Sequence, residues 1–138
     1  MSRSLMTWIL ITDTVFILYW TMAALLEFGL LSIDPNLMYA DYGLPRVVAW
    51  NWSFFPLDII FSLIGFAAVS ASRRGEPIWR PLAIISLTLT MTAGGMAVSY
   101  WAILWEFDPA WFLPNFGLVI WPLFFMPRLV RESALPAT

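Results

Sequence analysis

Four long apolar segments, separated by short polar turns, constrain this chain more than any other feature. They run over about residues 5–31, 47–71, 81–105 and 110–126. A helix of about 20 apolar residues is long enough to cross the hydrocarbon of a bilayer. The pattern therefore predicts an all-α membrane protein, a four-helix transmembrane bundle in which residues 1–138 form a single domain. The polar stretch at 32–45, rich in Pro, Asn, Asp and Gly, is expected to be a loop.

The composition supports a membrane protein and narrows the chemistry that it can perform. Hydrophobic residues make up 61% of the chain and charged residues 12%, too little polar surface to cover a soluble globule. Cysteine, histidine and lysine are absent, which excludes disulfides, Schiff bases and a Ser-His-Asp triad. No metal or cofactor is predicted. The few basic residues outside the membrane flanks disfavour nucleic-acid binding.

The arginines predict the orientation in the membrane. Six of them fall on one side of a four-span arrangement and only Arg46 falls on the other; the six are Arg3, Arg73, Arg74, Arg80, Arg128 and Arg131. Because basic residues are retained on the cytoplasmic side, both termini are expected to be cytoplasmic. The chain is thus expected to be a multi-pass protein of the inner (plasma) membrane.

Three stretches resemble a known family. They are residues 11–20 (ITDTVFILYW), 48–58 (VAWNWSFFPLD) and 111–115 (WFLPN). These are similar to segments of the YvaD-like family of small bacterial four-span membrane proteins, a domain of unknown function. The resemblance implies the four-span fold and a bacterial inner membrane, and it implies no activity.

Polar residues recur at helical spacing on three of the segments, so each of these helices has a face unsuited to lipid. The first stripe holds Asp13, Trp20, Ala24 and Glu27, the second Asn51, Phe54 or Phe55, Asp58, Ser62 and Gly65, and the third Thr88, Thr92, Gly95 and Ser99. The three faces are expected to converge in the bundle. At about 1.5 Å per residue, Asp13, Asp58 and Thr92 form a middle layer. Asn51, Ser99 and Asn115 form an outer layer, with Glu27 nearest the water.

Asp58 and Asp13 stand out because a carboxylate in hydrocarbon is costly, by about 2.5–3.5 kcal/mol on insertion scales. The chain has no lysine or histidine to pair with them, and its arginines lie near the membrane ends. Burial disfavours the charged form, so at least one of the two acids is expected to be protonated. Two readings stay open: a ligand or catalytic role, or a neutral acid hydrogen-bonded for packing alone.

Most other polar and aromatic residues also have a purely structural reading. Small residues let membrane helices approach closely, and asparagines join helices by hydrogen bonds. Most tryptophans fit two interfacial belts: Trp8 and Trp79 on one side, and Trp50, Trp52, Trp101, Trp105 and Trp111 on the other. Trp20 and Trp121 fall deeper.

Three functional hypotheses follow. The first is an intramembrane pocket for a lipid or lipophilic small molecule, with Asp58 and Asp13 as polar or catalytic groups. Its ligand-binding residues would be Trp20, Glu27, Asn51, Phe54, Phe55, Thr92, Ser99, Tyr100 and Asn115. An enzymatic version would isomerise or cyclise an isoprenoid- or sterol-like substrate, because an acid can generate a carbocation that aromatic rings stabilise.

The other two hypotheses need partners. A proton-coupled transporter of a small cation or amine would use Asp58 as its coupling acid, and four short spans would then require a homo-oligomer. An accessory subunit of a larger membrane complex would use the aromatic content, 17% of residues, for contacts with other subunits.

Overall fold

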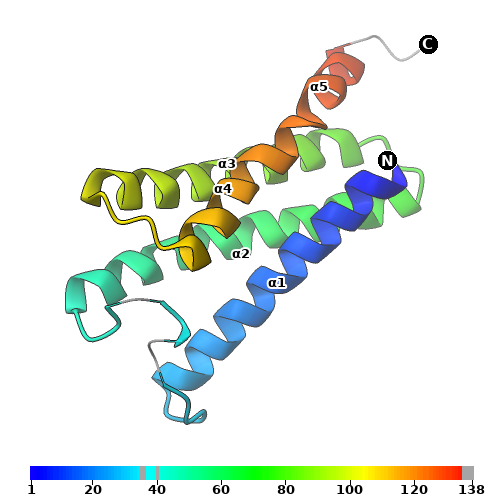
Figure 1. The fold of residues 1–138 in the computed structure, drawn as a ribbon. Helices are drawn as coiled ribbons and strands as arrows, with labels where there is room; N and C mark the ends of the chain where they lie inside the picture. Colours follow the sequence, from blue (N-terminus) through cyan, green and yellow to red (C-terminus); the bar gives the residue numbers. More distant parts are fainter. Residues whose placement is uncertain (35–36, 40, 135–138) are drawn as a thin grey trace.

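The computed structural model describes residues 1–34, 37–39 and 41–134, and this part of the chain is all-α (Figure 1). Its helices are α1 (Arg3–Glu27), α2 (Pro45–Arg73), α3 (Trp79–Leu104), α4 (Pro109–Leu123) and α5 (Met126–Ala134). The first three are each long and apolar enough to cross a membrane, and α4 and α5 together provide a fourth candidate span, Pro109–Ser133. The predicted four-span fold is confirmed.

Local signals in the sequence set the helix ends. The Ser2 hydroxyl accepts a hydrogen bond from the Leu5 amide (3.2 Å) and caps α1. Proline occupies the first turn of α2 and of α4, where its missing N–H costs nothing. The Asp108 carboxylate accepts from the Ala110 amide (2.9 Å) and caps α4. The predicted first span ran to residue 31, whereas α1 ends at Glu27.

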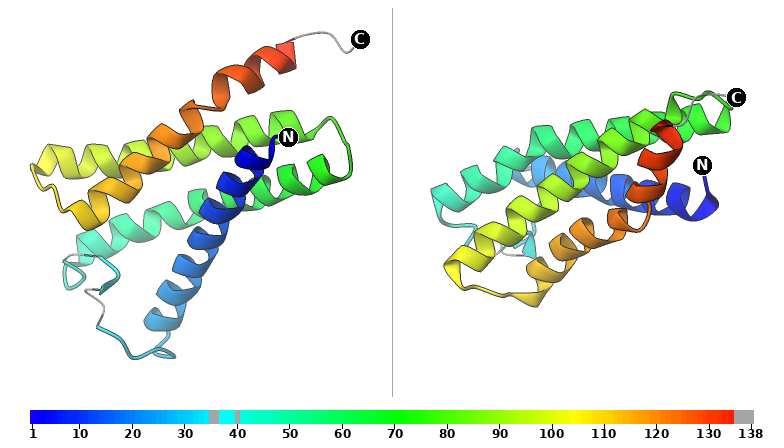
Figure 2. Two further views of the ribbon diagram at one scale, coloured as in Figure 1. Left: turned by 45° about the vertical axis from the view of Figure 1, so that its right-hand side comes forward. Right: turned by 90° about the horizontal axis from the view of Figure 1, so that it is seen from above.

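The four spans alternate in direction, with α5 continuing α4, and α1 splays away from the others toward one end of the bundle (Figures 1 and 2). α2 packs against both α1 and α3, and α3 packs against α4. The N-terminus, the α2–α3 turn and α5 lie at one end, called here the terminal end. The loop of residues 28–44 and the turn of residues 105–108 lie at the opposite end, called the loop end.

The two ends have separate apolar clusters. The terminal-end cluster contains Leu5, Ile9, Ala68, Val69, Ala83, Leu87, Trp121 and Leu129. The loop-end cluster contains Trp20, Ala23, Met38, Tyr39, Val47, Phe54, Phe61, Ala93 and Ala97. Two of its members, Met38 and Tyr39, come from the 28–44 loop, and their side chains are therefore buried against the bundle.

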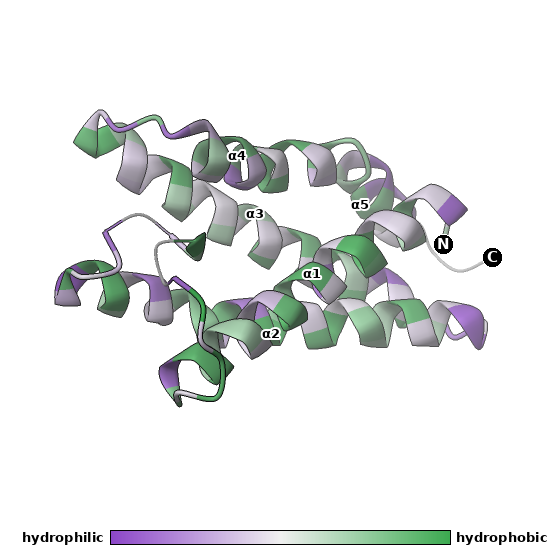
Figure 3. Cartoon of the chain, turned by 60° about the horizontal axis from the view of Figure 1, so that its bottom comes forward, coloured by the Kyte–Doolittle hydropathy of each residue, from purple (hydrophilic) through white to green (hydrophobic). Residues whose placement is uncertain are grey.

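Strongly hydrophilic residues lie mainly in the turns and near the helix ends, and the helices between them are mostly apolar (Figure 3). Ile11, Leu18, Leu63 and Ile103 are examples of large apolar residues that are more than half exposed. Such a surface suits lipid and not water. The protein that this fold defines is a multi-pass membrane protein.

Helices α3 and α4 approach closely at Gly94. A Cβ atom added to Gly94 would lie 2.6 Å from the Asn115 carbonyl oxygen and 2.8 Å from the Leu118 Cβ. Backbone on α4 therefore occupies the space that any side chain at position 94 would need. The neighbouring Gly95 has open space around it.

The predicted inward stripe on the third span was wrong. Thr88, Thr92 and Ser99 are all exposed, and the buried face of α3 consists of Ala83, Ser86, Leu87, Thr90, Ala93, Gly94, Ala97 and Trp101. The Thr92 hydroxyl donates to the Thr88 carbonyl (2.9 Å), so it can face lipid with its hydrogen bond already made. The middle layer therefore lacks Thr92.

Candidate functional site

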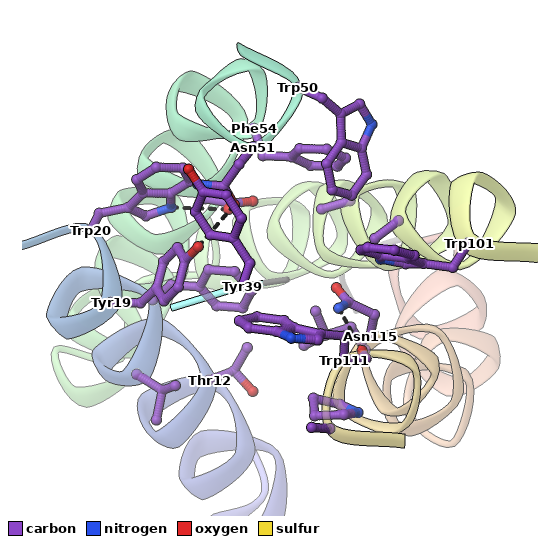
Figure 4. A pocket seen from close by; sticks show the side chains of 18 of the residues that line it. Thr12, Tyr19, Trp20, Tyr39, Trp50, Asn51, Phe54, Trp101, Trp111 and Asn115 are labelled. Atoms are coloured by element: carbon purple, nitrogen blue, oxygen red, sulfur yellow. Dashed lines mark hydrogen bonds between the residues drawn. The ribbon is translucent and has the colours of Figure 1, made fainter. Parts of the chain in front are cut away.

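A cavity of about 380 Å³ lies among α1, α2, α3, α4 and the 28–44 loop (Figure 4). Its volume is in the range of small-molecule sites. Eight of its lining residues are aromatic: Phe16, Tyr19, Trp20, Tyr39, Trp50, Phe54, Trp101 and Trp111. Ala93 and Ala97 on α3 leave the space that larger side chains would fill. The cavity is thus a consequence of small residues on one helix facing large rings on the others.

Asp58 supplies the carboxyl group of the cavity wall. It is 3% exposed, and its Oδ2 accepts a hydrogen bond from the Trp20 indole N–H at 3.0 Å. Its Oδ1 is buried and has no hydrogen-bond partner among the described residues. Buried polar atoms are normally paired, so an unpaired carboxyl oxygen beside a cavity indicates a missing partner.

Two further polar groups of the wall also lack a partner in the described part of the chain. The Tyr19 hydroxyl donates to Asn51 Oδ1 (2.8 Å), while Asn51 Nδ2 is left unpaired. The Tyr39 hydroxyl is buried and unpaired, and Tyr39 itself is 4% exposed. Burial, with Tyr42 and Glu27 nearby, raises the pKa of Tyr39 to about 12, so its hydroxyl remains a donor at neutral pH. An acid, an amide and a hydroxyl thus share one aromatic cavity.

The cavity opens sideways between α1 and α4. Ile11 and Val15 of α1 line it and are 54% and 56% exposed, and the exposed Ala110 and Pro114 line it from α4. The two helices meet at the terminal end, where the Trp8 and Trp121 rings stack with centroids 5.6 Å apart. The exposed residues at this opening are all apolar.

Asp13 lies on a different layer from Asp58. It is 1% exposed, and its Oδ2, unpaired among the described residues, fills the space above Gly65, where an added Cβ would lie only 1.9 Å away. Asp13 and Trp20 are seven residues apart on α1, and Asp58 and Gly65 are seven residues apart on α2. Seven residues make two helical turns, so the Asp13–Gly65 contact lies about 10 Å from the Trp20–Asp58 contact. Asp13 is absent from the cavity lining, and its contacts are those of helix packing.

The other predicted site residues fall into two groups. Trp20, Phe54, Asn51 and Asn115 line the cavity, and the Asn115 amide donates to the Trp111 carbonyl (2.8 Å). The residues that do not line it are Glu27, Phe55, Tyr100, Thr92 and Ser99.

Each residue outside the lining has its own surroundings. Glu27 is exposed at the end of α1 and accepts a hydrogen bond from the Tyr42 hydroxyl (3.3 Å). The Phe55 ring lies against Trp20 in a shallower outer groove between α1 and α2. Tyr100 stacks on Trp50, with ring centroids 4.1 Å apart.

Sequence reasoning missed the residues that close the loop end. Tyr39 was assigned only to a loop, and Trp50, Trp101 and Trp111 to an interfacial belt, yet all four line the cavity. The rings of Tyr39 and Trp111 pack edge to face, with their centroids 6.5 Å apart. The one available signal was the tyrosine content of the 28–44 loop, because Tyr39 and Tyr42 are large rings in a segment otherwise rich in turn residues.

Comparison with known proteins identifies the family. Residues 5–135 match the model of DUF5360, a family of unknown function, and the chain belongs to this family. The chain is 39% identical over 131 residues to the uncharacterized protein YvaD of Bacillus subtilis (strain 168), covering 95% of each chain. The resemblance read from the sequence is confirmed. No solved structure matches.

Proposed function

We propose that this protein binds a lipophilic small molecule in the cavity between α1 and α4, with Asp58 as its main polar anchor. One observation carries the proposal: an aromatic cavity whose wall contains three unpaired polar atoms, on Asp58, Asn51 and Tyr39. A ligand with an apolar body and one polar group would pair those atoms and fill the space. It would reach the cavity from the membrane, through the opening beside Val15.

The same cavity favours one chemical extension. Asp58 is its only lining carboxyl in the described part of the chain, and aromatic rings flank it. Such an acid would protonate an alkene of an isoprenoid- or sterol-like substrate, and the rings would stabilise the resulting carbocation by cation–π attraction. Asp13 has no part in this chemistry, because it contacts Gly65 and not the cavity.

The transporter and accessory-subunit hypotheses have less support. A transport pathway within one bundle would have to continue through its terminal half, where the terminal-end cluster packs Ile9, Leu87 and Trp121 together. A purely structural subunit would have no use for a cavity whose polar wall atoms lack partners. Binding of a small molecule accounts for both features.

A cavity-filling substitution tests the proposal. Ala97 is 5% exposed and lines the cavity, so Ala97→Leu would occupy the ligand's space. Ser99→Leu on the exposed face of α3 is the matched control, because it adds an apolar side chain that faces lipid. Both variants and the wild type are purified in mild detergent, and bound small molecules are measured by native mass spectrometry.

The proposal predicts a defined hydrophobic molecule with the wild type and with Ser99→Leu, and its loss from folded Ala97→Leu. The wild type is also reconstituted with the total lipid extract of its host, so that a ligand lost on purification can rebind. An identical set of bound molecules in all three proteins, after both treatments, would contradict the proposal.

A further inference from the structure

The most informative feature of the cavity is a carboxyl group that has no cation to pair with. Asp58 is 3% exposed and its Oδ1 is unpaired among the described residues. The chain contains neither lysine nor histidine, and none of its seven arginines lines the cavity. The nearest in sequence on the same helix is Arg46, twelve residues away and about 18 Å along the axis. A positive charge near Asp58 must therefore come from a ligand.

The other walls are those that a cation prefers. Five of the lining rings come from three helices and the loop: Tyr19, Trp20, Tyr39, Trp50 and Trp111 (Figure 4). The negative face of an aromatic ring attracts ammonium groups, and the attraction is strongest where water is excluded. Aromatic cages with a nearby carboxylate are the usual surroundings of bound alkylammonium ions.

The hydrogen bond from Trp20 adds to this preference. The indole N–H binds Oδ2 and fixes the orientation of the carboxyl group, with Oδ1 left over. A cationic ligand would stabilise the carboxylate form of Asp58, because opposite charges attract strongly in a medium of low dielectric constant even without direct contact.

We propose that the ligand is a lipophilic amine or quaternary ammonium ion, whose positive charge lies among the aromatic rings beside Asp58. This assignment rests on the proposed function, since it names the chemical class of the molecule in the same cavity. It differs from binding of a neutral lipid because the ligand's charge, and not only its apolar surface, contributes to affinity.

A pair of isosteric probes separates charge from shape. Benzyltrimethylammonium and neopentylbenzene have the same shape and differ by one positive charge. Their binding to the full chain in nanodiscs of zwitterionic lipid is measured by titration calorimetry, with empty nanodiscs subtracted. We expect the cation to bind at least tenfold more tightly than the neutral probe. Asp58→Asn should remove most of that difference and leave the affinity for neopentylbenzene unchanged.

Two further variants keep the test decisive. Glu27→Gln removes an exposed carboxylate at the loop end and should leave both affinities unchanged. Trp111→Leu removes one aromatic wall and keeps the carboxyl group, so it should weaken binding of the cation severalfold more than binding of the neutral probe. If Asp58→Asn does not fold, Trp111→Leu decides the question.

The outcomes distinguish this inference from the function on which it rests. Equal affinity for both probes in the wild type, or full cation affinity in folded Asp58→Asn, would overturn the assignment of a cationic ligand while the lipophilic pocket stands. Absence of binding by either probe, together with unchanged co-purifying molecules in Ala97→Leu, would remove the pocket itself.

Discussion

At the scale of single residues, the Trp20–Asp58 hydrogen bond is the contact that makes a buried carboxyl group tolerable in this fold. The bond joins α1 to α2 at 3.0 Å and satisfies one oxygen of a side chain that is 3% exposed. An unsatisfied buried polar group costs about 1–3 kcal/mol, so removal of the donor leaves Asp58 with two unpaired oxygens.

Trp20→Phe should therefore lower the free energy of unfolding by about 1–3 kcal/mol. Trp52→Phe is the matched control, because the Trp52 ring lies 5.3 Å from that of Trp20 but makes no hydrogen bond among the described residues. Unfolding in mixed micelles with increasing SDS measures both. Equal losses for the two variants would show that ring volume, and not the hydrogen bond, sets the effect.

Asp13 and Gly65 form the second buried contact between α1 and α2. Gly65→Ala should destabilise the protein, because the new methyl group would lie 1.9 Å from Asp13 Oδ2 and 2.9 Å from its Cγ. Asp13→Ala in the same chain should recover most of the loss by vacating that space. A double-mutant cycle measures the coupling energy between positions 13 and 65. A coupling energy near zero would show that the Asp13 side chain does not contact Gly65.

At the scale of helices, α3 shows how glycine sets the distance between neighbours. Gly94→Ala should separate α3 from α4, since the added Cβ would lie 2.6 Å from a backbone oxygen that cannot move alone. Gly95→Ala meets nothing within 4 Å and should be neutral or slightly stabilising, because alanine favours helix over glycine by about 1 kcal/mol. Thermal unfolding of both variants in the same detergent tests this pair. A greater loss of thermal stability in Gly95→Ala than in Gly94→Ala would show that Gly95, and not Gly94, faces α4.

The same helix shows where sequence reasoning fails in a membrane. The four spans follow from length and hydropathy, although α1 ends at Glu27 and not at the predicted residue 31, but the buried face of α3 does not. Lipid is as apolar as the protein core, so no hydrophobic contrast marks the inner face. Two faces of α3 carry small and hydroxyl residues, and the threonines at 88 and 92 satisfy their hydroxyls within their own helix. The sequence pattern therefore favoured the wrong stripe.

The candidate site was predictable in part for a related reason. Asp58, Asn51 and Trp20 could be placed inside because their polar groups need partners that lipid cannot offer. Tyr39 could not, because only the tertiary fold brings the 28–44 loop over the bundle, where it packs in the loop-end cluster. The stacking of Tyr100 behind Trp50 likewise depends on a helix contact that spacing alone does not reveal.

At the scale of the whole molecule, the splayed α1 gives the cavity its exit toward lipid. Val15→Trp should narrow that opening, because Val15 lines the cavity and is 56% exposed. Leu18→Trp places the same ring at a position that is 58% exposed and outside the lining, and should have no effect. We expect at least a tenfold slower association of benzyltrimethylammonium with Val15→Trp alone, measured by stopped-flow tryptophan fluorescence. An unchanged association rate in Val15→Trp would show that the ligand enters from the loop end and not between α1 and α4.

Binding of a lipophilic molecule next to Asp58 in the loop-end cavity is the property proposed for the molecule as a whole. An experimental structure of the full chain, purified from its native membrane into lipid nanodiscs, tests it most directly. We expect non-protein density between α1 and α4, enclosed by Tyr39 and Trp111 and within hydrogen-bond or ion-pair distance of the Asp58 carboxyl group. A bundle in which α1 closes onto α4 along its whole length, with no space beside Asp58, would contradict it.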